Sequence, residues 1–494
     1  METIDKCVRK LSSGKACGPD GLSAEHLKFA HPSLVIHLCA LFRAIVASGR
    51  VPDAFGSGII VPLIKDKTGN ASSLNNYRGI TLISVIAKLF ELVLLEICGN
   101  YLLTDDLQFG FKHNIGCPNA IFAFRSTVDY FCERGSTVYA ASPDISKAFD
   151  NVNHCKLFKS LSETGIPKWI LSLLANWYCK LNVAVRWNGA FSDSFHVSSG
   201  VRQGSILSPS LFTVFMNMFI VRLRTLGSGC HVGDHFVGCI LYADDIILLS
   251  ATVNGLQRML NCCYEVSCGL LLTFNCSKSY CFVVGSGCKY NIADMHLGSN
   301  HIQWYDSVKY LGVTFYGGSK LKVNTNVIKQ HFFAAFNSVH GNSHSLDELI
   351  QLQLHESFCL PLLQYAMCAV KLSSSQEAEL NACWNTVYRR IFNYRKYDSV
   401  STIICGLGRL DFKHLHTLWT LKFIKKCCFS QNVVVRCLGK LFTISGEFKQ
   451  LCSRFDVDAS SYFSHISFGA IRCATYEHFV YYVERNKCSF HFFA

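Results

Sequence analysis

The stretch CILYADDIILLS, residues 239–250, decides how the rest of the chain is interpreted. Its two halves are apolar, as in strands buried inside a sheet, yet Asp244 and Asp245 stand side by side at its centre. A buried carboxylate is costly unless something compensates it, and two adjacent carboxylates also repel each other. A lone Asp-Asp pair is more commonly a solvated surface turn, but the apolar flanks argue against that here. We therefore expect a tight hairpin that presents both carboxylates at its tip to a bound cation.

A third carboxylate is expected close to this hairpin. The stretch VYAASPDISKAFDNVNH, residues 138–154, begins as a strand and delivers Asp144 at the end of that strand. Oxygen ligands of this kind select Mg²⁺ or Mn²⁺. Three carboxylates on two adjacent strands suit a two-metal site, in which the ions activate a hydroxyl and neutralise charge during in-line phosphoryl transfer. The sequence thus predicts Asp144, Asp244 and Asp245 as metal ligands.

Composition points to a globular protein with a polyanionic partner. Of the 494 residues, 50% are apolar and 16% are charged, which excludes a disordered chain. The 47 Lys and Arg outnumber the 34 Asp and Glu, and the net charge of +13 suits nucleic acid. No apolar run is long enough to span a membrane, and the N-terminal stretch has no signal-peptide pattern. We therefore expect an intracellular protein without a membrane partner, in the nucleus or the cytoplasm.

The 26 cysteines are interpreted as reduced thiols and small core residues, because a chain without a secretory signal meets no oxidising compartment. No Cys-x-x-Cys pair occurs, so structural zinc is not expected.

Hydrophobic periodicity predicts alternating helices and strands through the first two thirds of the chain. The pattern becomes mainly helical from residue 320, and the Phe- and Cys-rich segment beyond about residue 430 gives no clear indication. Helices are expected over 22–49, 82–98, 154–178 and 208–226, and strands over 58–67, 137–144, 182–187 and 236–250.

The Tyr-Ala-Asp-Asp sequence at 242–245 resembles the catalytic motif of reverse transcriptases. Further blocks along the chain, in the same order, are similar to the motifs of non-LTR (LINE-type) retrotransposon enzymes. These blocks are GKACGPDGLSAEHLK (14–28), VPLIKDK (61–67), NYRGITLISVIAKLFE (76–91), QFGFKHNIGCPNAI (108–121), DISKAFDNVNH (144–154), SSGVRQGSILSPSLFTVFMN (198–217), LLTFNCSKSYCFVVG (271–285), VKYLGVTF (308–315), LPLLQYAMCAVKL (360–372) and NTVYRRIF (385–392).

The resemblance implies an α+β, right-hand polymerase fold. It divides the chain into a helical N-terminal extension (1–55), fingers and palm with an antiparallel palm sheet (56–316), a helical thumb (317–430) and a C-terminal region of unknown role (431–494). The implied activity is that of an RNA-directed DNA polymerase, in which a primer 3′-hydroxyl attacks the α-phosphate of a dNTP. The implied partners are an RNA template, a DNA primer or target, and dNTPs.

The family pattern also assigns catalytic roles. Asp144 and Asp244 would be the principal ligands of two Mg²⁺ ions, with Mn²⁺ able to substitute, and Asp245 would be the adjoining carboxylate. Lys278 matches a lysine that would protonate the pyrophosphate leaving group, although on its own it reads as a surface lysine. Asp150 is matched as well, but its distance from the metals favours a structural role.

Five further residues are implied in binding the incoming nucleotide. Lys65 and Arg78 match fingers positions that contact the triphosphate; without the resemblance both would be solvated surface charges. Phe149 falls where the family places a bulky gate against a ribose 2′-hydroxyl, or it is an ordinary core residue. Gln203 and Gly204 lie in GVRQGS, where glycine allows the backbone to approach the base pair and substrate closely.

Two departures from the family pattern favour an alternative. Pro143 precedes Asp144 where a larger apolar residue is usual, and in a central strand it would remove a ladder donor unless its amide position faces away from the neighbour. The chain begins just before the fingers extension, so we expect a truncated element without the upstream endonuclease domain. The alternative is therefore a decayed remnant that binds nucleic acid without polymerising. An intron maturase or a telomerase-like enzyme is disfavoured by the LINE-like blocks at 14–21 and 360–366.

Overall fold

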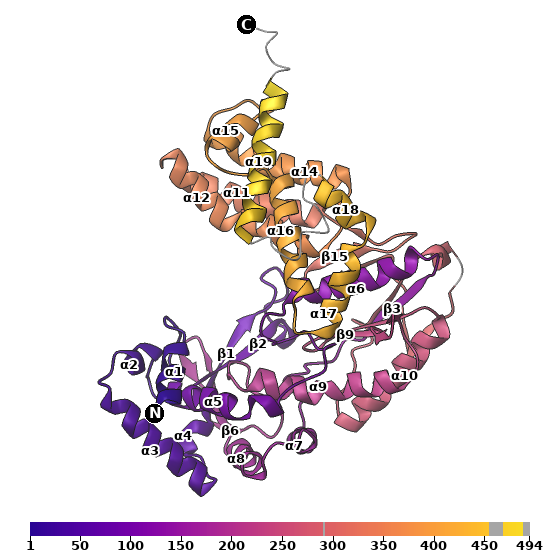
Figure 1. Ribbon diagram of the computed structural model, residues 1–494. Helices are drawn as coiled ribbons and strands as arrows, with labels where there is room; N and C mark the ends of the chain where they lie inside the picture. Colours follow the sequence, from indigo (N-terminus) through magenta and orange to yellow (C-terminus); the bar gives the residue numbers. More distant parts are fainter. Residues whose placement is uncertain (290–291, 454–467, 488–494) are drawn as a thin grey trace.

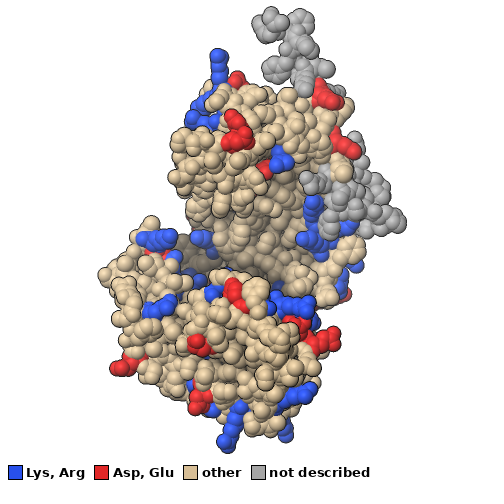
Figure 2. Space-filling model, turned by 90° about the vertical axis from the view of Figure 1, so that its left-hand side faces the viewer, with Lys and Arg blue, Asp and Glu red and all other residues tan. Residues whose placement is uncertain are grey.

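A computed structural model describes residues 1–289, 292–453 and 468–487. Helices and two main sheets form the lower part of the molecule, and a stack of helices from the last third of the chain rises above them (Figure 1). A deep hollow separates the two parts, with Lys and Arg side chains at its rim (Figure 2). In the ranges described, no helix combines the length and apolarity that crossing a membrane requires.

The N-terminal helix α1 packs against α2, α3 and α5. The long helix α3 ends where the sequence predicts, at Gly49, which adopts the left-handed conformation (φ 66°) that stops helices. The predicted helix over 22–49 is split, because Pro32 begins a new helix. The elements are α1 (Glu2–Lys10), α2 (Ala24–Lys28), α3 (Ser33–Ser48), α4 (Asp53–Gly56), α5 (Val85–Cys98) and the short 3₁₀ helices η1 (Leu74–Asn76) and η2 (Gly99–Tyr101).

A five-stranded sheet, which we call the fingers sheet, follows these helices. Its order is β2-β1-β4-β5, with β6 also paired to β4; β1 runs antiparallel to β2 and parallel to β4. In this register Leu63 pairs with Arg78, so the two charged ends of the β1–β2 hairpin lie together. The strands are β1 (Ser57–Ile64), β2 (Tyr77–Ile83), β4 (Asn182–Trp187), β5 (Ala190–Phe191) and β6 (Phe195–His196).

The second sheet, which we call the palm sheet, is four-stranded and entirely antiparallel, in the order β11-β3-β10-β9. The helices α6 and α10 pack against it, and α9 packs against α7 and α10. The elements are β3 (Val138–Ser142), β9 (Cys239–Tyr242), β10 (Asp245–Ser250), β11 (Tyr280–Val284), α6 (Cys117–Cys132), α7 (His154–Glu163), α8 (Lys168–Tyr178), α9 (Ser208–Thr225), α10 (Val253–Leu270), and the hairpin β7 (His231–Val232) and β8 (His235–Phe236).

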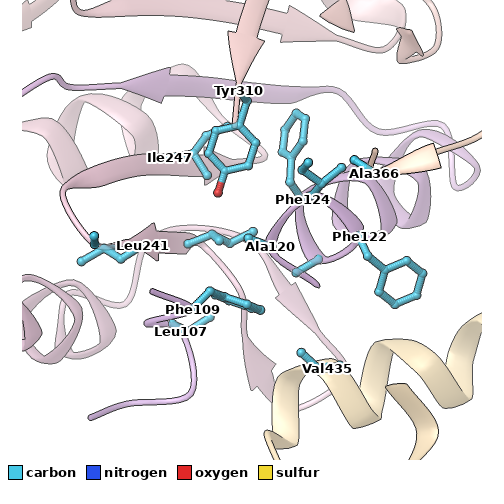
Figure 3. Packing of buried hydrophobic residues seen from close by; sticks show 14 of the residues in the cluster. Leu107, Phe109, Ala120, Phe122, Phe124, Leu241, Ile247, Tyr310, Ala366 and Val435 are labelled. Atoms are coloured by element: carbon cyan, nitrogen blue, oxygen red, sulfur yellow. The ribbon is translucent and has the colours of Figure 1, made fainter. Parts of the chain in front are cut away.

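Short strands lead from the palm sheet to the upper helices. Phe124 of α6 contacts the rings of Phe282, Tyr310 and Phe315 edge-on, and this cluster joins α6 to β11, β14 and β15. Figure 3 shows Phe124 and Tyr310 side by side. The connecting elements are η3 (Ser286–Lys289), β12 (Met295–Leu297), β13 (Asn300–Ile302), β14 (Ser307–Tyr310), β15 (Val313–Tyr316) and β16 (Lys322–Val323).

The upper part is helical, as predicted. Beyond residue 430, α17 packs against both α16 of the upper part and α6 of the palm. The helices are α11 (Asn326–Ser343), α12 (Glu348–Phe358), α13 (Leu360–Gln364), η4 (Met367–Ala369), α14 (Ser374–Ile391), α15 (Ser401–Gly406), α16 (Phe412–Cys428), α17 (Val433–Thr443), α18 (Gly446–Ser453) and α19 (Phe468–Lys487). The rest of the C-terminal region, 454–467 and 488–494, lies outside the described residues.

Candidate active site

The stretch 239–250 forms the predicted hairpin. Strands β9 and β10 pair through Tyr242 and Asp245, which leaves only Ala243 and Asp244 in the turn. Residues 246–250 are buried in the palm sheet, which accounts for their apolar character. The two aspartates therefore stand at the tip of a rigid pair of buried strands.

Asp144 follows the neighbouring strand β3 and is held by the loop that leads into β11. Its N–H donates to the hydroxyl oxygen of Ser279 (2.9 Å), and its carbonyl oxygen accepts from the N–H of Asn275 (2.7 Å). These two hydrogen bonds fix the backbone of Asp144 just past the end of the strand. The third carboxylate thus stands on rigid backbone beside the hairpin.

The three carboxylates act on one another electrostatically. Burial raises the pKa of Asp144, with a further increase from Asp244, while Lys278 lowers it. Burial also raises the pKa of Asp244, and the nearby Arg78 guanidinium opposes that change. The Asp245 side chain reaches solvent, but protein surrounds much of it. This burial is the largest cause that raises the pKa of Asp245 to about 6, and the charges of Asp244 and Asp144 add to it. Such a cluster is unfavourable when ionised and favours a bound cation.

The donors fit a hard divalent cation, because all three offer carboxylate oxygens. Asp144 and Asp245 line one polar cavity of about 290 Å³ together with Lys278, whereas Asp244 lies on the turn. Among residues 1–289, 292–453 and 468–487, no three acidic, His or Cys side chains already form a closed ligand set. The site therefore offers the right atoms for a metal without a preformed cage.

Lys278 lies beside the carboxylates. It shares the cavity with Asp144 and Asp245, and its charge acts on Asp144. Residues 309–312, at the end of β14 and in the turn that follows it, also line the cavity. The Tyr280 hydroxyl donates to the carbonyl oxygen of Lys309 (3.0 Å). Lys278 is exposed, and its catalytic role stays a prediction.

The two fingers cations differ in their surroundings. Arg78 is exposed, and its charge lowers the pKa of Asp244. Lys65 is exposed, and its ammonium donates to the carbonyl oxygen of Asn75 (3.1 Å) in the loop between β1 and β2. In this structure Lys65 braces that loop, and its contact with a triphosphate stays a prediction.

The Phe149 ring is held firmly in one orientation. It stacks on Phe212, with ring centroids 4.0 Å apart and planes 21° apart, and it meets Phe111 edge-on. The backbone carbonyl oxygen of Phe149 accepts from the N–H of Val201 (2.8 Å). The ring is half-buried, so it is neither a free surface group nor a fully buried core residue.

Gln203 and Gly204 lie against the fingers sheet. The Gln203 carbonyl accepts from the N–H of Thr81 (2.6 Å), and its side-chain amide donates to Asp150 (3.0 Å), which fits the structural role expected for Asp150. Gly204 has φ 121°, and a Cβ there would lie 2.5 Å from the Thr81 carbonyl oxygen. We expected close approach to a substrate at this glycine; the approach that the structure records is to β2.

Glu91 is a residue that sequence reasoning missed. It is 2% exposed, and its carboxylate accepts from the Ser205 hydroxyl (2.7 Å) and the Ile206 N–H (2.7 Å). It also pairs with Arg202, whose guanidinium lies over the Trp177 ring. Glu91 thereby anchors the GVRQGS loop and the start of α9. The available signal was a single acid within the apolar helical stretch 85–95.

Pro143 lies one residue beyond β3, so it is not inside the strand as we expected. Continuing the pairing of Ala141 with Leu248 places Ile246 opposite Pro143. The Asp144 N–H donates to Ser279, beside β11. Successive N–H groups along a strand point to opposite neighbours, so an N–H at position 143 would point toward Ile246 of β10. The Ser142 hydroxyl donates to the Ile246 carbonyl instead (2.8 Å). The lost ladder bond is thus replaced.

Comparison with known proteins agrees with this geometry. The sequence model of the family described as reverse transcriptase (RNA-dependent DNA polymerase) matches residues 64–315, just over half of the 494 residues. The chain belongs to the reverse transcriptase family. The match covers the palm sheet, the fingers sheet except for most of β1, and all three carboxylates, and it supports the right-hand polymerase fold expected from the motifs.

Curated relatives carry the names of retrotransposable elements. The chain is 27% identical over 334 residues to a Pol polyprotein of the type-2 retrotransposable element R2DM of Drosophila melanogaster, covering 65% of this chain and 30% of that protein. It is 25% identical over 331 residues to the RNA-directed DNA polymerase of the mobile element jockey of the same species, covering 64% and 35%. The resemblance to non-LTR elements is confirmed. The chain spans about a third of the length of these relatives.

Among solved structures, the telomerase of Candida albicans in complex with a fragment of telomeric RNA is similar over 84% of this chain and 68% of that one. The TM-score is 0.42 and the identity 11%.

Proposed function

We propose that this reverse transcriptase is an RNA-directed DNA polymerase of a non-LTR retrotransposon, which extends a DNA primer on an RNA template. The observation that carries the proposal is the approach of Asp144 to the Asp244–Asp245 hairpin, on strands that the palm sheet holds rigidly. Acidic groups with raised pKa values that share a polar cavity with a lysine are typical of a catalytic centre. An RNA–DNA hybrid would occupy the hollow with basic side chains at its rim (Figure 2).

Asp144, Asp244 and Asp245 would hold two Mg²⁺ ions, or Mn²⁺. When bound, these ions would lower the pKa of the primer 3′-hydroxyl and neutralise charge that develops on the phosphates. Lys278, beside Asp144, would hold a proton for the leaving pyrophosphate. Arg78 and Lys65 would bind the triphosphate from the fingers side, with Arg78 already close enough to act on Asp244.

The remaining nucleotide contacts concern the sugar and the base pair. The fixed Phe149 ring would exclude a ribose 2′-hydroxyl, since its stack on Phe212 leaves it little freedom to turn away. Gln203 and Gly204 would lie under the nascent base pair, held in place by β2 and Asp150. Access to chromosomal DNA would require entry into the nucleus.

Primer extension tests the proposal. The purified chain is incubated with oligo(dT) on poly(rA), dTTP and Mg²⁺, beside the double variant Asp244→Ala/Asp245→Ala. We expect extension by the wild type and none by the variant. A wild-type chain that is folded and binds the hybrid without extending it would overturn the polymerase and support a remnant that only binds nucleic acid.

A further inference from the structure

The turn that carries Asp244 has an unusual backbone. Ala243 has φ 58°, a left-handed conformation that residues with a Cβ rarely adopt. The residue is buried, so its N–H and carbonyl groups need partners inside the protein. Any loss of these partners would let the turn relax, and Asp244 would move with it.

The Gln108 side chain bonds to both the N–H and the carbonyl group of Ala243. The Gln108 Oε1 accepts from the Ala243 N–H (3.0 Å), and its Nε2 reaches the Ala243 carbonyl oxygen (3.4 Å). The same Oε1 accepts from the N–H of Gly110 (2.9 Å), which fixes the orientation of the amide. Gln108 is completely buried, so water does not compete for these bonds.

The backbone around Gln108 is itself anchored to the hairpin. Leu241 of β9 donates to the Leu107 carbonyl (2.9 Å) and accepts from the Phe109 N–H (2.7 Å), so residues 107–109 form a parallel bridge along the edge of the palm sheet. Gly110 lies so close to the Ala243 backbone that a Cβ would collide with it. Gln108 is therefore placed on a rigid element beside the turn.

The C-terminal region braces this element from the other side. Asn432, which caps α17, donates to the Asp106 carbonyl (2.6 Å), and the Val433 N–H donates to the Asp106 carboxylate (2.9 Å). Leu107, Phe109 and Val435 lie in the same buried cluster (Figure 3). The start of α17 thus contacts the residues that hold Gln108.

We propose that Gln108 is a positioning residue, whose amide holds the Ala243 turn so that Asp244 faces the other carboxylates. The inference rests on the proposed polymerase function. Gln108 itself touches no reacting atom. Its removal would loosen the turn and weaken divalent-cation binding and the chemical step, while leaving hybrid binding unchanged.

The test compares Gln108→Met with Gln351→Met. Gln351 is also a buried glutamine, and its amide donates to the Leu346 carbonyl in the upper helices (2.8 Å), far in sequence from the hairpin. Gln108→Glu is a second variant that retains the acceptor for the Ala243 N–H and loses the donor, in case the methionine variant does not fold. Hydrogen exchange of the peptide spanning 239–250, the dissociation constant of Mn²⁺ and primer extension are measured for each.

We expect both Gln108 variants to exchange faster at 242–245, to bind Mn²⁺ about tenfold more weakly and to lose kcat with little change in hybrid affinity, as for other groups that orient metal ligands. Gln351→Met should change none of these. Unchanged exchange and Mn²⁺ affinity in a folded Gln108 variant would overturn the proposal, as would equal losses in Gln351→Met. An inactive wild type would overturn the polymerase function alone, since hydrogen exchange still decides the role of Gln108.

Discussion

The Ser142 hydroxyl donates a 2.8 Å hydrogen bond to the carbonyl oxygen of Ile246, the acceptor that stands opposite Pro143 across the palm sheet. The proline beside Asp144 thereby costs the sheet no hydrogen bond. This relationship removes the main argument for a decayed site, because Asp144 keeps both of its own backbone hydrogen bonds.

The hydrogen bond from Ser142 to Ile246 predicts that substitutions of Ser142 and Pro143 have coupled effects on stability. Ser142→Ala should destabilise the chain by about 1 kcal/mol, because the Ile246 carbonyl then has no donor. In a Pro143→Leu background the same substitution should be nearly neutral, since the new N–H supplies the bond. Urea unfolding of the four proteins of this double-mutant cycle measures the coupling. Equal losses in the two backgrounds would show that Ser142 does not replace the proline.

Pro143→Leu alone should change primer extension by less than about threefold, which corresponds to less than ~0.7 kcal/mol of barrier. A large gain in kcat on restoring leucine would mean that the proline displaces Asp144 after all.

Glu91 and Arg202 form a buried ion pair, with side chains 2% and 8% exposed. Glu91→Ala should cost about 3–5 kcal/mol of unfolding free energy, because it leaves a buried guanidinium unpaired. Glu91→Gln should cost less, since its single amide oxygen still accepts from one of the two donors, Ser205 or Ile206. Thermal and urea unfolding measure both variants. A loss of less than about 1 kcal/mol in Glu91→Ala would contradict the anchoring role.

The raised pKa of Asp245 makes a pH-dependent prediction. A carboxyl with a pKa of about 6 in the folded chain and an ordinary value of 3.8 destabilises the metal-free fold increasingly from about pH 4 to pH 6, and constantly above that. Asp245→Asn removes this effect, so the metal-free variant should melt above the wild type at pH 7.5, and the difference should vanish near pH 4. Mg²⁺ should raise the melting temperature of the wild type more than that of the variant. A variant that melts below the wild type at pH 7.5 would contradict the cluster.

The Phe149 ring predicts sugar selectivity. Phe149→Val should increase the use of UTP relative to dTTP by about tenfold or more, as kcat/KM ratios on the same primer, because the space against the 2′-hydroxyl opens. The loss of the stack on Phe212 should also destabilise the fold. Phe212→Leu removes the same stack and frees the Phe149 ring, so it should shift the sugar ratio in the same direction by a smaller factor. An unchanged ratio in Phe149→Val would contradict the gate.

The palm could be predicted from sequence because its signals are local. The apolar runs on both sides of Asp244 and Asp245 indicate buried strands, and the strand before Asp144 ends within two residues of the predicted position. Gln108, Glu91 and Ser142 could not be assigned roles, because each acts through partners more than a hundred residues away. The Phe- and Cys-rich composition beyond residue 430 shows no helical or strand periodicity of apolar residues. The structure nevertheless forms the helices α17 and α18 there, and they bury Val434, Val435 and Phe448.

The central claim is that Asp144 and the hairpin form a working polymerase site. Its most direct test is single-nucleotide incorporation of dTTP into a DNA primer annealed to RNA, for the wild type and Asp144→Asn, with hybrid affinity measured in the same samples. We predict incorporation by the wild type, a loss of at least about a thousandfold in the variant, and equal hybrid affinity in both. Equal incorporation rates, or a folded, hybrid-bound wild type that adds no nucleotide, would contradict the claim.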